Sequence, residues 1–375
     1  MQGARIIKYC TLMVSISFAL SLASATIIPN MLLSAYAFPH LAAAGDWGCN
    51  SNTDQTVKSI KNHGATLTLG LGDYSYEDNS VTCWLNKVAP IDEDNDPSTP
   101  ARTLKINIGN HDDDSSSKLN ALKNHFGLTN LYYSFNIENV HVLVINTEDS
   151  SSSLKETSGA QNKFIKSDLE SAAANPNIRW KIVIFHKPMF TSPNGCSSSS
   201  CEGSSSLTKA IQPYLDNNKV DAVFVGHVHN YQRSFPVKFN PSNPLNPTTT
   251  TKLPNDYVNP TGRVYAIVGT GGVNFHSLKS KANFIASQQA TKFGQLDITF
   301  SQTATRDILT GQFCANDASV SDPCSKSSNI LDKFTIQKNF PTTASSNNAN
   351  SNAREENGIN SMSTRDDPFS TMGFR

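Results

Sequence analysis

The sequence predicts an α/β fold in which parallel strands end at a common edge and carry polar side chains there. Five short apolar runs each stop at a turn that holds a potential metal ligand, and these ligands are Asp46, Asp73, Asn110, His186 and His227. The gaps of 27 residues from Asp46 to Asp73, 37 to Asn110, and 41 from His186 to His227 suit a strand, a helix and a return strand. Because ligands bind where parallel strands end, we expect these side chains to converge on one site.

The stretch from Val223 to Pro236 gives the clearest signal. An apolar run stops at Gly226 and is followed by His227 and His229, two imidazoles two residues apart. Alternate side chains of an extended segment share a face, so both rings can reach neighbouring points of one site. Alone, such a pair is more often a polar turn than a pair of ligands. Together with the upstream Asp, Asn and His residues, it forms an oxygen and nitrogen donor set suited to two hydrolytic metal ions.

The remaining elements follow from apolar periodicity and turn residues. Tyr132 to Asn146 is expected to form two antiparallel strands around a turn at Glu138-Asn139, and Ser192 to Ser206 a loop at the mouth of the site. Further strands are expected near 264–268, 295–300 and 334–337, and helices over 51–62, 84–88, 118–126 and 161–174.

Composition excludes some partners. With 375 residues, of which 38% are apolar and 17% charged, the chain can bury one large core. Its formal charge is zero and its pI is near 7.1, so no overall basic field attracts nucleic acid or an anionic membrane. We expect no nucleic-acid partner and leave the oligomeric state open.

The N-terminus and the cysteines both predict export. Residues 1–25 are expected to be a signal peptide, because Arg5 and Lys8 precede an apolar stretch and a small-residue cleavage signal at 23–25. An uncleaved membrane anchor is the alternative. Either interpretation predicts a secreted, periplasmic or cell-surface protein.

Six cysteines remain after Cys10 is set aside with the signal peptide. An even number in an exported chain predicts disulfide bonds, although six cysteines allow fifteen pairings. Zinc binding by thiolates is the alternative, but the chain contains no Cys-x-x-Cys. The pairing that we favour is Cys49 with Cys83, Cys196 with Cys201, and Cys314 with Cys324.

Five motifs in order resemble those of the calcineurin-like metallophosphoesterases. They are Gly-Asp-Trp-Gly at 45–48, Gly-Asp-x-x-Tyr at 72–76, Gly-Asn-His-Asp at 109–112, a lone His186 after a strand, and Gly-His-x-His at 226–229. Tyr76 and the continuation Asn-Tyr-Gln-Arg at 230–233 resemble the purple acid phosphatase branch specifically. The resemblance runs from about Ala42 to Gly272. It implies two mixed β-sheets packed as a sandwich and flanked by helices, a four-layer α/β/β/α architecture.

The resemblance also implies two metal sites. Fe(III) is favoured in the first because a phenolate is a strong donor for a trivalent metal, although Tyr76 could instead be a packed loop aromatic. Fe(II), Zn or Mn would occupy the second. The first site would comprise Asp46, Asp73, Tyr76 and His229; the second would comprise Asp73, Asn110, His186 and His227, so that Asp73 bridges the two ions.

The resemblance assigns catalysis and substrate binding to a few further residues. His111 would contact the phosphate and protonate the leaving oxygen, and Asp73 would act with it in catalysis. Asp112 could orient the His111 ring or stabilise a turn. Arg233 could bind the phosphate or form a structural ion pair. His40, His63, His125, His141 and His276 match no motif and are expected at the surface or in packing.

One feature departs from plant and animal purple acid phosphatases. Those enzymes carry further His or Glu residues in the loop after the ligand matched by His186, whereas the run from Lys187 to Cys201 contains neither. Substrate contacts are therefore expected to differ, and acid assistance would rest on His111.

These observations predict an exported metal-dependent acid phosphatase that hydrolyses phosphomonoesters with a hydroxide activated by two metals. The metallophosphoesterase domain would span residues 26–340, and the Ser/Asn-rich segment 341–375 would form a disordered tail. One alternative is a phosphodiesterase or nucleotidase with two divalent metals, favoured if Tyr76 points away and an aromatic pocket lies near Phe190. Another is a metal-binding surface protein without turnover.

Overall fold

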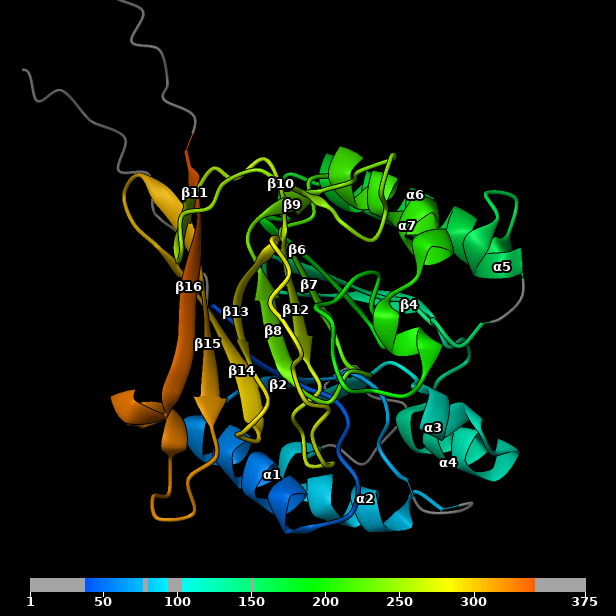
Figure 1. Cartoon of the computed structure of the whole chain (residues 1–375), viewed down its shortest axis with the longest axis vertical. Helices are drawn as coiled ribbons and strands as arrows, with labels where there is room; N and C mark the ends of the chain where they lie inside the picture. The colour runs from blue at the N-terminus through cyan, green and yellow to red at the C-terminus, as the bar shows by residue number, and fades with distance from the viewer. Residues whose placement is uncertain (1–37, 77–79, 94–102, 150–151, 341–375) are drawn as a thin grey trace, which may run out of the picture.

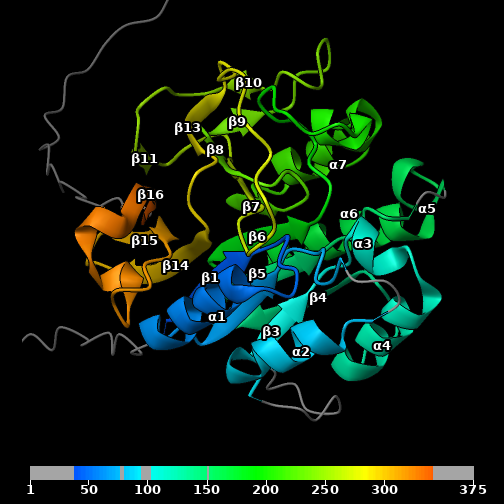
Figure 2. The ribbon, with the colours of Figure 1, turned by 60° about the horizontal axis from the view of Figure 1, so that its bottom comes forward.

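The computed structural model describes residues 38–76, 80–93, 103–149 and 152–340, so the predicted signal peptide and tail lie outside the described residues. Two seven-stranded mixed sheets pack face to face, with helices on their outer faces (Figure 1). Figure 2 shows the four layers in succession, from α1, α2 and α4 through the two sheets to α6 and α7. The predicted α/β sandwich is confirmed.

The first sheet has the strand order β11-β16-β15-β14-β1-β2-β3. Its parallel part leads toward the predicted ligands and consists of β1 (His40–Ala44), β2 (Leu67–Gly70) and β3 (Leu104–Ile106). Its antiparallel part consists of β14 (Gly294–Gln302), β15 (Arg306–Ala315) and β16 (Ile330–Asn339), and β11 (Asp256–Val258) adds to its edge.

The second sheet has the order β13-β8-β12-β7-β6-β5-β4. Four parallel strands form its centre: β5 (Val140–Val144), β6 (Trp180–Phe185), β7 (Ala222–Val225) and β12 (Val264–Val268). Antiparallel pairs complete it through β4 (Tyr133–Ile137), β8 (Tyr231–Ser234) and β13 (Ile285–Gln289). A separate two-stranded ribbon joins β9 (Val237–Lys238) and β10 (Thr248–Thr249).

Helices cover the two outer faces because each presents an apolar stripe to a sheet. The first sheet is covered by α1 (Ser51–His63), α2 (Thr82–Val88) and α4 (Ser116–Phe126), and α3 (Asn110–Asp113) follows β3. The second is covered by α5 (Ser152–Lys155), α6 (Ala160–Ala174) and α7 (Ser205–Asn217). Short 3₁₀ turns are η1 (Ala89–Ile91), η2 (Ser199–Glu202), η3 (Pro323–Ser325) and η4 (Ser327–Asn329).

Most predicted elements are confirmed, but several were missed, among them the long elements α7 and β15. The helix α7 contains Pro213, and an interior proline removes a helical hydrogen bond, so the segment carries a strong signal against a helix. The apolar stripe of Leu207, Ile211 and Leu215 packs against the second sheet, and this burial outweighs the cost of the proline. The strand β15 was also not predicted, although its burial alternates along most of its length.

The three favoured disulfides are confirmed: Cys49–Cys83, Cys196–Cys201 and Cys314–Cys324. The first joins the segments that follow Asp46 and Asp73, and so it closes the chain around the predicted site. No helix in the described part of the chain is both long and apolar enough to cross a membrane.

Candidate metal centre

All seven predicted metal ligands lie in one cluster beyond the ends of β1, β2, β3, β6 and β7, where both sheets open toward the same side. Asp46 and Asp73 are almost fully buried, as is His186, while the remaining ligands are buried or half-buried. The sequence therefore located each of these residues correctly at the exit of a strand. Their contacts divide them into two groups.

The first group surrounds the hydroxyl of Tyr76. This oxygen lies 3.3 Å from Asp46 Oδ1, 3.3 Å from Asp73 Oδ2 and 3.0 Å from His229 Nε2. His229 is held by its other nitrogen, because Nδ1 donates to the carbonyl of Asn274 at 2.9 Å. Tyr76 thus points into the cluster and is not a packed loop aromatic; Tyr74 fills that role, with its hydroxyl donating to the carbonyl of Asn107.

The second group surrounds Nε2 of His186. This atom lies 3.2 Å from Asp73 Oδ2, 3.3 Å from Asn110 Oδ1 and 3.2 Å from His227 Nδ1. Nδ1 of His186 donates to the carbonyl of Leu71 at 2.8 Å, which fixes the tautomer and leaves Nε2 facing the cluster.

Asp73 belongs to both groups, and its Oδ2 atom contacts a member of each. Its other oxygen, Oδ1, accepts a hydrogen bond from the backbone N–H of His111 at 2.8 Å. One carboxylate is therefore fixed in orientation while the remaining oxygen lies between two sets of oxygen and nitrogen donors. This arrangement suits a carboxylate that bridges two metal ions through one oxygen.

The backbone is strained at three of the ligands. Asp46, Asp73 and His227 have φ values of 60°, 54° and 72°, in the left-handed region that residues other than glycine rarely adopt. Each of them directly follows a glycine that lies just beyond the end of a strand. Such strain persists only where the surroundings hold it, and it clusters at functional sites.

No side chain fits at the glycines that precede two of the candidate ligands, because a Cβ atom there would clash with the neighbouring loop. A Cβ atom at Gly72 would lie 2.5 Å from Nδ1 of His186, and one at Gly109 would lie 2.2 Å from Oδ1 of Asp73. The Gly-Asp and Gly-Asn pairs in the sequence therefore reflect the close approach of the loops that carry the ligands.

The electrostatics of the cluster fit cation binding. Burial alone would lower the pKa of His186, but the charge of Asp73 raises it to about 10. Burial and the charges of Asp73 and Asp46 hold the pKa of Tyr76 well above its usual range. The imidazole of His186 and the phenol of Tyr76 therefore keep their protons unless another cation takes the place of those protons. A proton and a metal ion compete for these atoms, and the donor set of carboxylates, imidazoles, an amide and a phenol suits the metal.

His111 lies beside the cluster without joining it. Its ring packs at a tilt against that of Tyr76, with centroids 4.4 Å apart, and its side chain is 42% exposed and lines the cavity. Asp112 does not orient this ring. Its carboxylate accepts hydrogen bonds from the backbone N–H groups of Asp73, Tyr74 and Gly109, each at 2.8 Å, so it stabilises the two turns.

The predicted substrate role of Arg233 is not supported by the structure. Its guanidinium is 1% exposed and forms a two-pronged ion pair with Asp332, at 2.6 Å and 2.8 Å. It also donates to the hydroxyl of Tyr257 and lies over the ring of Phe334. Arg233 therefore connects the second sheet to the first, and it is absent from the residues that line the cavity over the cluster.

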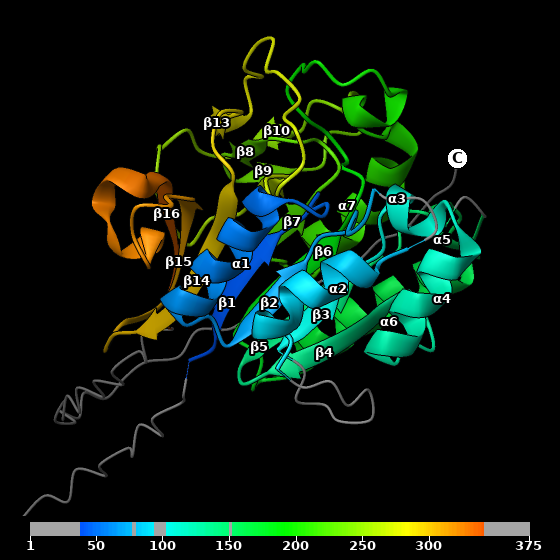
Figure 3. The same cartoon turned by 90° about the horizontal axis from the view of Figure 1, so that it is seen from below.

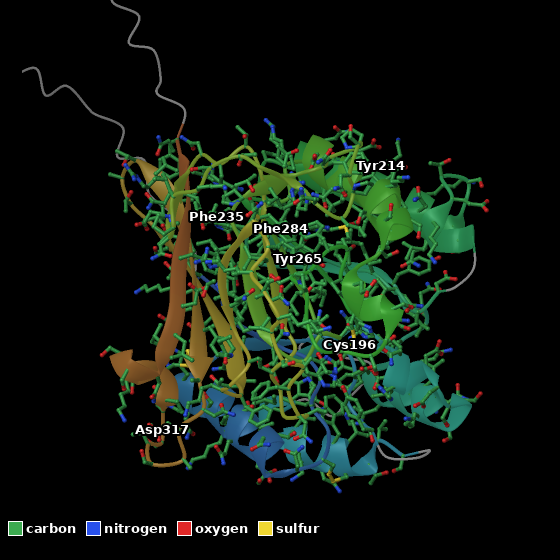
Figure 4. All side chains as sticks on the ribbon, viewed as in Figure 1. Cys196, Tyr214, Phe235, Tyr265, Phe284 and Asp317 are labelled. Atoms are coloured by element: carbon green, nitrogen blue, oxygen red, sulfur yellow. A yellow bond between two sulfur atoms is a disulfide. The ribbon has the colours of Figure 1, made fainter. Side chains whose placement is uncertain are left out.

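A cavity of about 410 Å³ opens above the cluster and is lined by hydroxyl and imidazole groups. The predicted loop lies at its mouth: Ser197, Ser198 and Ser200 come from the short disulfide loop closed by Cys196, which Figure 4 labels. The hydroxyl of Ser200 lies 2.7 Å from Nε2 of His227 and so positions that ring.

His276 lines the cavity, although it matches no motif and was expected only at the surface or in packing. Its ring stacks on His229 with centroids 4.0 Å apart, and its Nδ1 accepts a hydrogen bond from the backbone N–H of His229 at 3.1 Å. It reaches the cavity from a loop after β12, with no motif around it. Only its position shortly beyond the glycine-rich turn at 269–272 could have indicated its place.

A two-sheet α/β fold with a buried cluster of Asp, Asn, His and Tyr side chains at its strand ends defines a metallophosphoesterase-type protein. The sequence profile of the calcineurin-like phosphoesterases matches residues 39–231, and the chain belongs to this family.

Several relatives are purple acid phosphatases. The chain is 29% identical over 243 residues to purple acid phosphatase 18 of Arabidopsis thaliana, covering 62% of this chain and 49% of the relative. It is 27% identical over 224 residues to purple acid phosphatase 22 of the same plant, covering 56% and 49%. The chain thus spans about half the length of the curated relatives it matches.

A solved structure shares the fold. Purple acid phosphatase PPD1 from yellow lupin (Lupinus luteus) seeds superimposes with a TM-score of 0.63 at 19% identity, covering 81% of this chain and 54% of that one. The purple acid phosphatase relatives agree with the branch that Tyr76 indicated, and the lupin structure shows the same fold.

Proposed function

We propose that this protein is an exported, metal-dependent acid phosphatase that hydrolyses phosphomonoesters at a dinuclear centre. The position of Asp73 carries the proposal, because a single carboxylate oxygen lies between two groups of ligands. The relatives support the same activity, since those at moderate identity are purple acid phosphatases.

The two groups of side chains define two metal sites. Fe(III) is favoured in the first, where the phenol of Tyr76 would lose its proton, and Fe(II), Zn or Mn in the second. When bound, the two ions supply an activated water and neutralise charge on the phosphoryl oxygens. The first site comprises Asp46, Asp73, Tyr76 and His229, and the second comprises Asp73, Asn110, His186 and His227.

The chain's own residues bind the substrate and transfer a proton. His111 reaches the cavity with an exposed imidazole and protonates the leaving oxygen. The serines of the disulfide loop and Lys187, which also line the cavity, hold the phosphate oxygens in place of the His and Glu residues that plant and animal enzymes carry there. Arg233 takes no part.

A phosphomonoester is favoured over a nucleotide or phosphodiester. The alternative of a phosphodiesterase or nucleotidase would be favoured if Tyr76 pointed away from the metals and an aromatic pocket lay near Phe190. Tyr76 points into the cluster, and Phe190 is buried against Tyr265 and Phe284, two residues labelled in Figure 4. The surface-protein alternative is not favoured, because the ligand set is intact. Three disulfides support export.

The test compares the turnover of p-nitrophenyl phosphate and bis(p-nitrophenyl) phosphate by the wild type and Asp73→Asn. We expect the monoester to be preferred and Asp73→Asn to lose both metal and activity while it stays folded. Asp113→Asn, at an exposed carboxylate near the same turn, is the matched control and should remain active. An Asp73→Asn protein that turns over the monoester at the wild-type rate would refute the dinuclear mechanism, and a preference for the diester would refute the substrate class.

A further inference from the structure

A second cluster of histidine and aspartate side chains lies at the opposite end of the first sheet. His40 begins β1, whereas Asp46 follows its end, so the two clusters are roughly 20 Å apart at ~3.3 Å per strand residue. His63 ends α1, which packs against β14 and runs beside β1 (Figure 3). Asp297 extends from β14, opposite Ala42 in register.

The three side chains meet around one buried carboxylate. Asp297 is 1% exposed, and its Oδ1 lies 2.5 Å from Nε2 of His40 while its Oδ2 lies 3.6 Å from Nε2 of His63. One ligand atom from each of the three lies within 4.8 Å of the others. A buried carboxylate is costly unless its charge is compensated, and here two imidazole nitrogens face it from different elements.

The surroundings orient the His63 ring. Its Nδ1 lies 3.1 Å from both oxygens of Asp322, so it donates to that carboxylate and directs Nε2 toward Asp297. A carboxylate behind a ligating histidine is the usual outer partner in zinc sites. Asp322 is itself held by the turn at η3, where its Oδ1 accepts from the backbone N–H of Cys324, a residue in a disulfide and hence not a thiolate ligand.

We propose that His40, His63 and Asp297 bind a divalent transition-metal ion, zinc by their chemistry, at a site separate from the candidate dinuclear centre. Two imidazoles, a carboxylate and a water complete a four-coordinate zinc site. His63 is the last residue of α1, and a helix C-terminus carries partial negative charge. This charge adds to the attraction of the three side chains for a cation.

The geometry is close to that of a bound site. Ligand bonds of ~2.0–2.2 Å in a tetrahedron place donor atoms about 3.4 Å apart, near the 3.6 Å between His63 and Asp297. The His40 ring lies closer to Asp297 and must withdraw by about 1 Å to admit the ion. Its side chain is 22% exposed, so it has a path toward solvent, and the ion has a path inward.

The metal content of the full chain tests the proposal. The protein is stripped with a chelator, loaded with Zn²⁺, freed of excess metal and analysed, as wild type and as His40→Ala and His63→Ala. We expect each variant to bind one equivalent less than the wild type. This difference does not depend on how many ions the candidate dinuclear centre holds, so failure of the proposed function and failure of this site are distinguishable.

His125→Ala is the matched control. His125 also pairs with a buried aspartate, with Nε2 2.8 Å from Asp92 Oδ2, but among the described residues no second histidine is recorded with them. It should bind as much zinc as the wild type. An anomalous-difference map at the zinc edge should show a peak between His40 and His63. Equal zinc content in the wild type and His63→Ala, or no such peak, would overturn the proposal and leave the cluster as a hydrogen-bonded ion pair.

Discussion

Replacement of Arg233 separates a structural role from a substrate role. The guanidinium is buried, and it forms a two-pronged ion pair with Asp332, whose carboxylate also accepts from the hydroxyl of Tyr231 at 2.7 Å. Arg233→Met keeps much of the apolar volume but leaves Asp332 without its cation. Breaking a buried pair in this way costs about 3–5 kcal/mol of the free energy of unfolding.

The expected shift in melting temperature follows from this cost. At ~2–4 °C per kcal/mol for a domain of this size class, the midpoint should fall by roughly 6–20 °C. Thermal unfolding followed by circular dichroism measures the shift. The kcat and KM for a phosphomonoester, measured well below the new midpoint, should stay within about twofold of the wild-type values, because Arg233 does not line the cavity.

A second variant serves as control. In Arg233→Met/Asp332→Leu both charges are gone, and replacing a whole buried pair by apolar residues is often neutral, so most of the lost stability should return. The reasoning would be refuted if Arg233→Met raised KM tenfold or more without a change in midpoint, since Arg233 would then bind the phosphate.

Three further predictions follow from the structure. His111→Ala should lower turnover ~10²–10⁴-fold while metal content stays unchanged, and metal loss would show that His111 is a ligand. Gly72→Ala places a Cβ 2.5 Å from Nδ1 of His186 at a φ of 86°, and the left-handed backbone alone costs ~1–2 kcal/mol; the variant should unfold at lower denaturant and bind metal more weakly, and wild-type values for both would contradict the packing. In the metal-free protein, the nearby carboxylate of Asp297, followed by that of Asp322, raises the pKa of His63 from 6.5 to about 9, so this group's contribution to stability is complete below pH 6.5 and is lost as the pH rises through 9. Denaturant unfolding at pH 6 and pH 9.5 should therefore show a smaller pH-dependent loss in His63→Ala than in the wild type, and equal losses would be inconsistent with the ion pair.

The sequence predicts the position of the candidate ligands well because each of them lies close to a strand end. A short apolar run precedes each of Asp46, Asp73, Asn110, His186 and His227. Parallel strands bring the residues at their ends together, irrespective of the length and conformation of the connecting segments. A periodic pattern along the chain therefore fixes a site made from segments that are far apart in sequence.

Apolar periodicity does not predict the position of side chains on irregular loops. It also does not predict which of several potential partners a side chain contacts. His276 reaches the cavity through a loop with no periodicity, and Ser200 through a short disulfide loop whose path depends on packing. Arg233 follows a ligand motif, yet its partner Asp332 lies 99 residues further along the chain. Only the packed sheets decide that the guanidinium pairs there rather than with a phosphate.

Metal-dependent hydrolysis is the central claim, and removal of metal tests it most directly. The release of p-nitrophenol from p-nitrophenyl phosphate is measured for the purified protein, for the same protein stripped by a chelator, and after metal is returned. We expect stripping to abolish turnover and the returned metal to restore it, because in the proposed mechanism two ions would be held by Asp73 and the side chains grouped around it. Full turnover by protein shown to carry no metal would contradict the account.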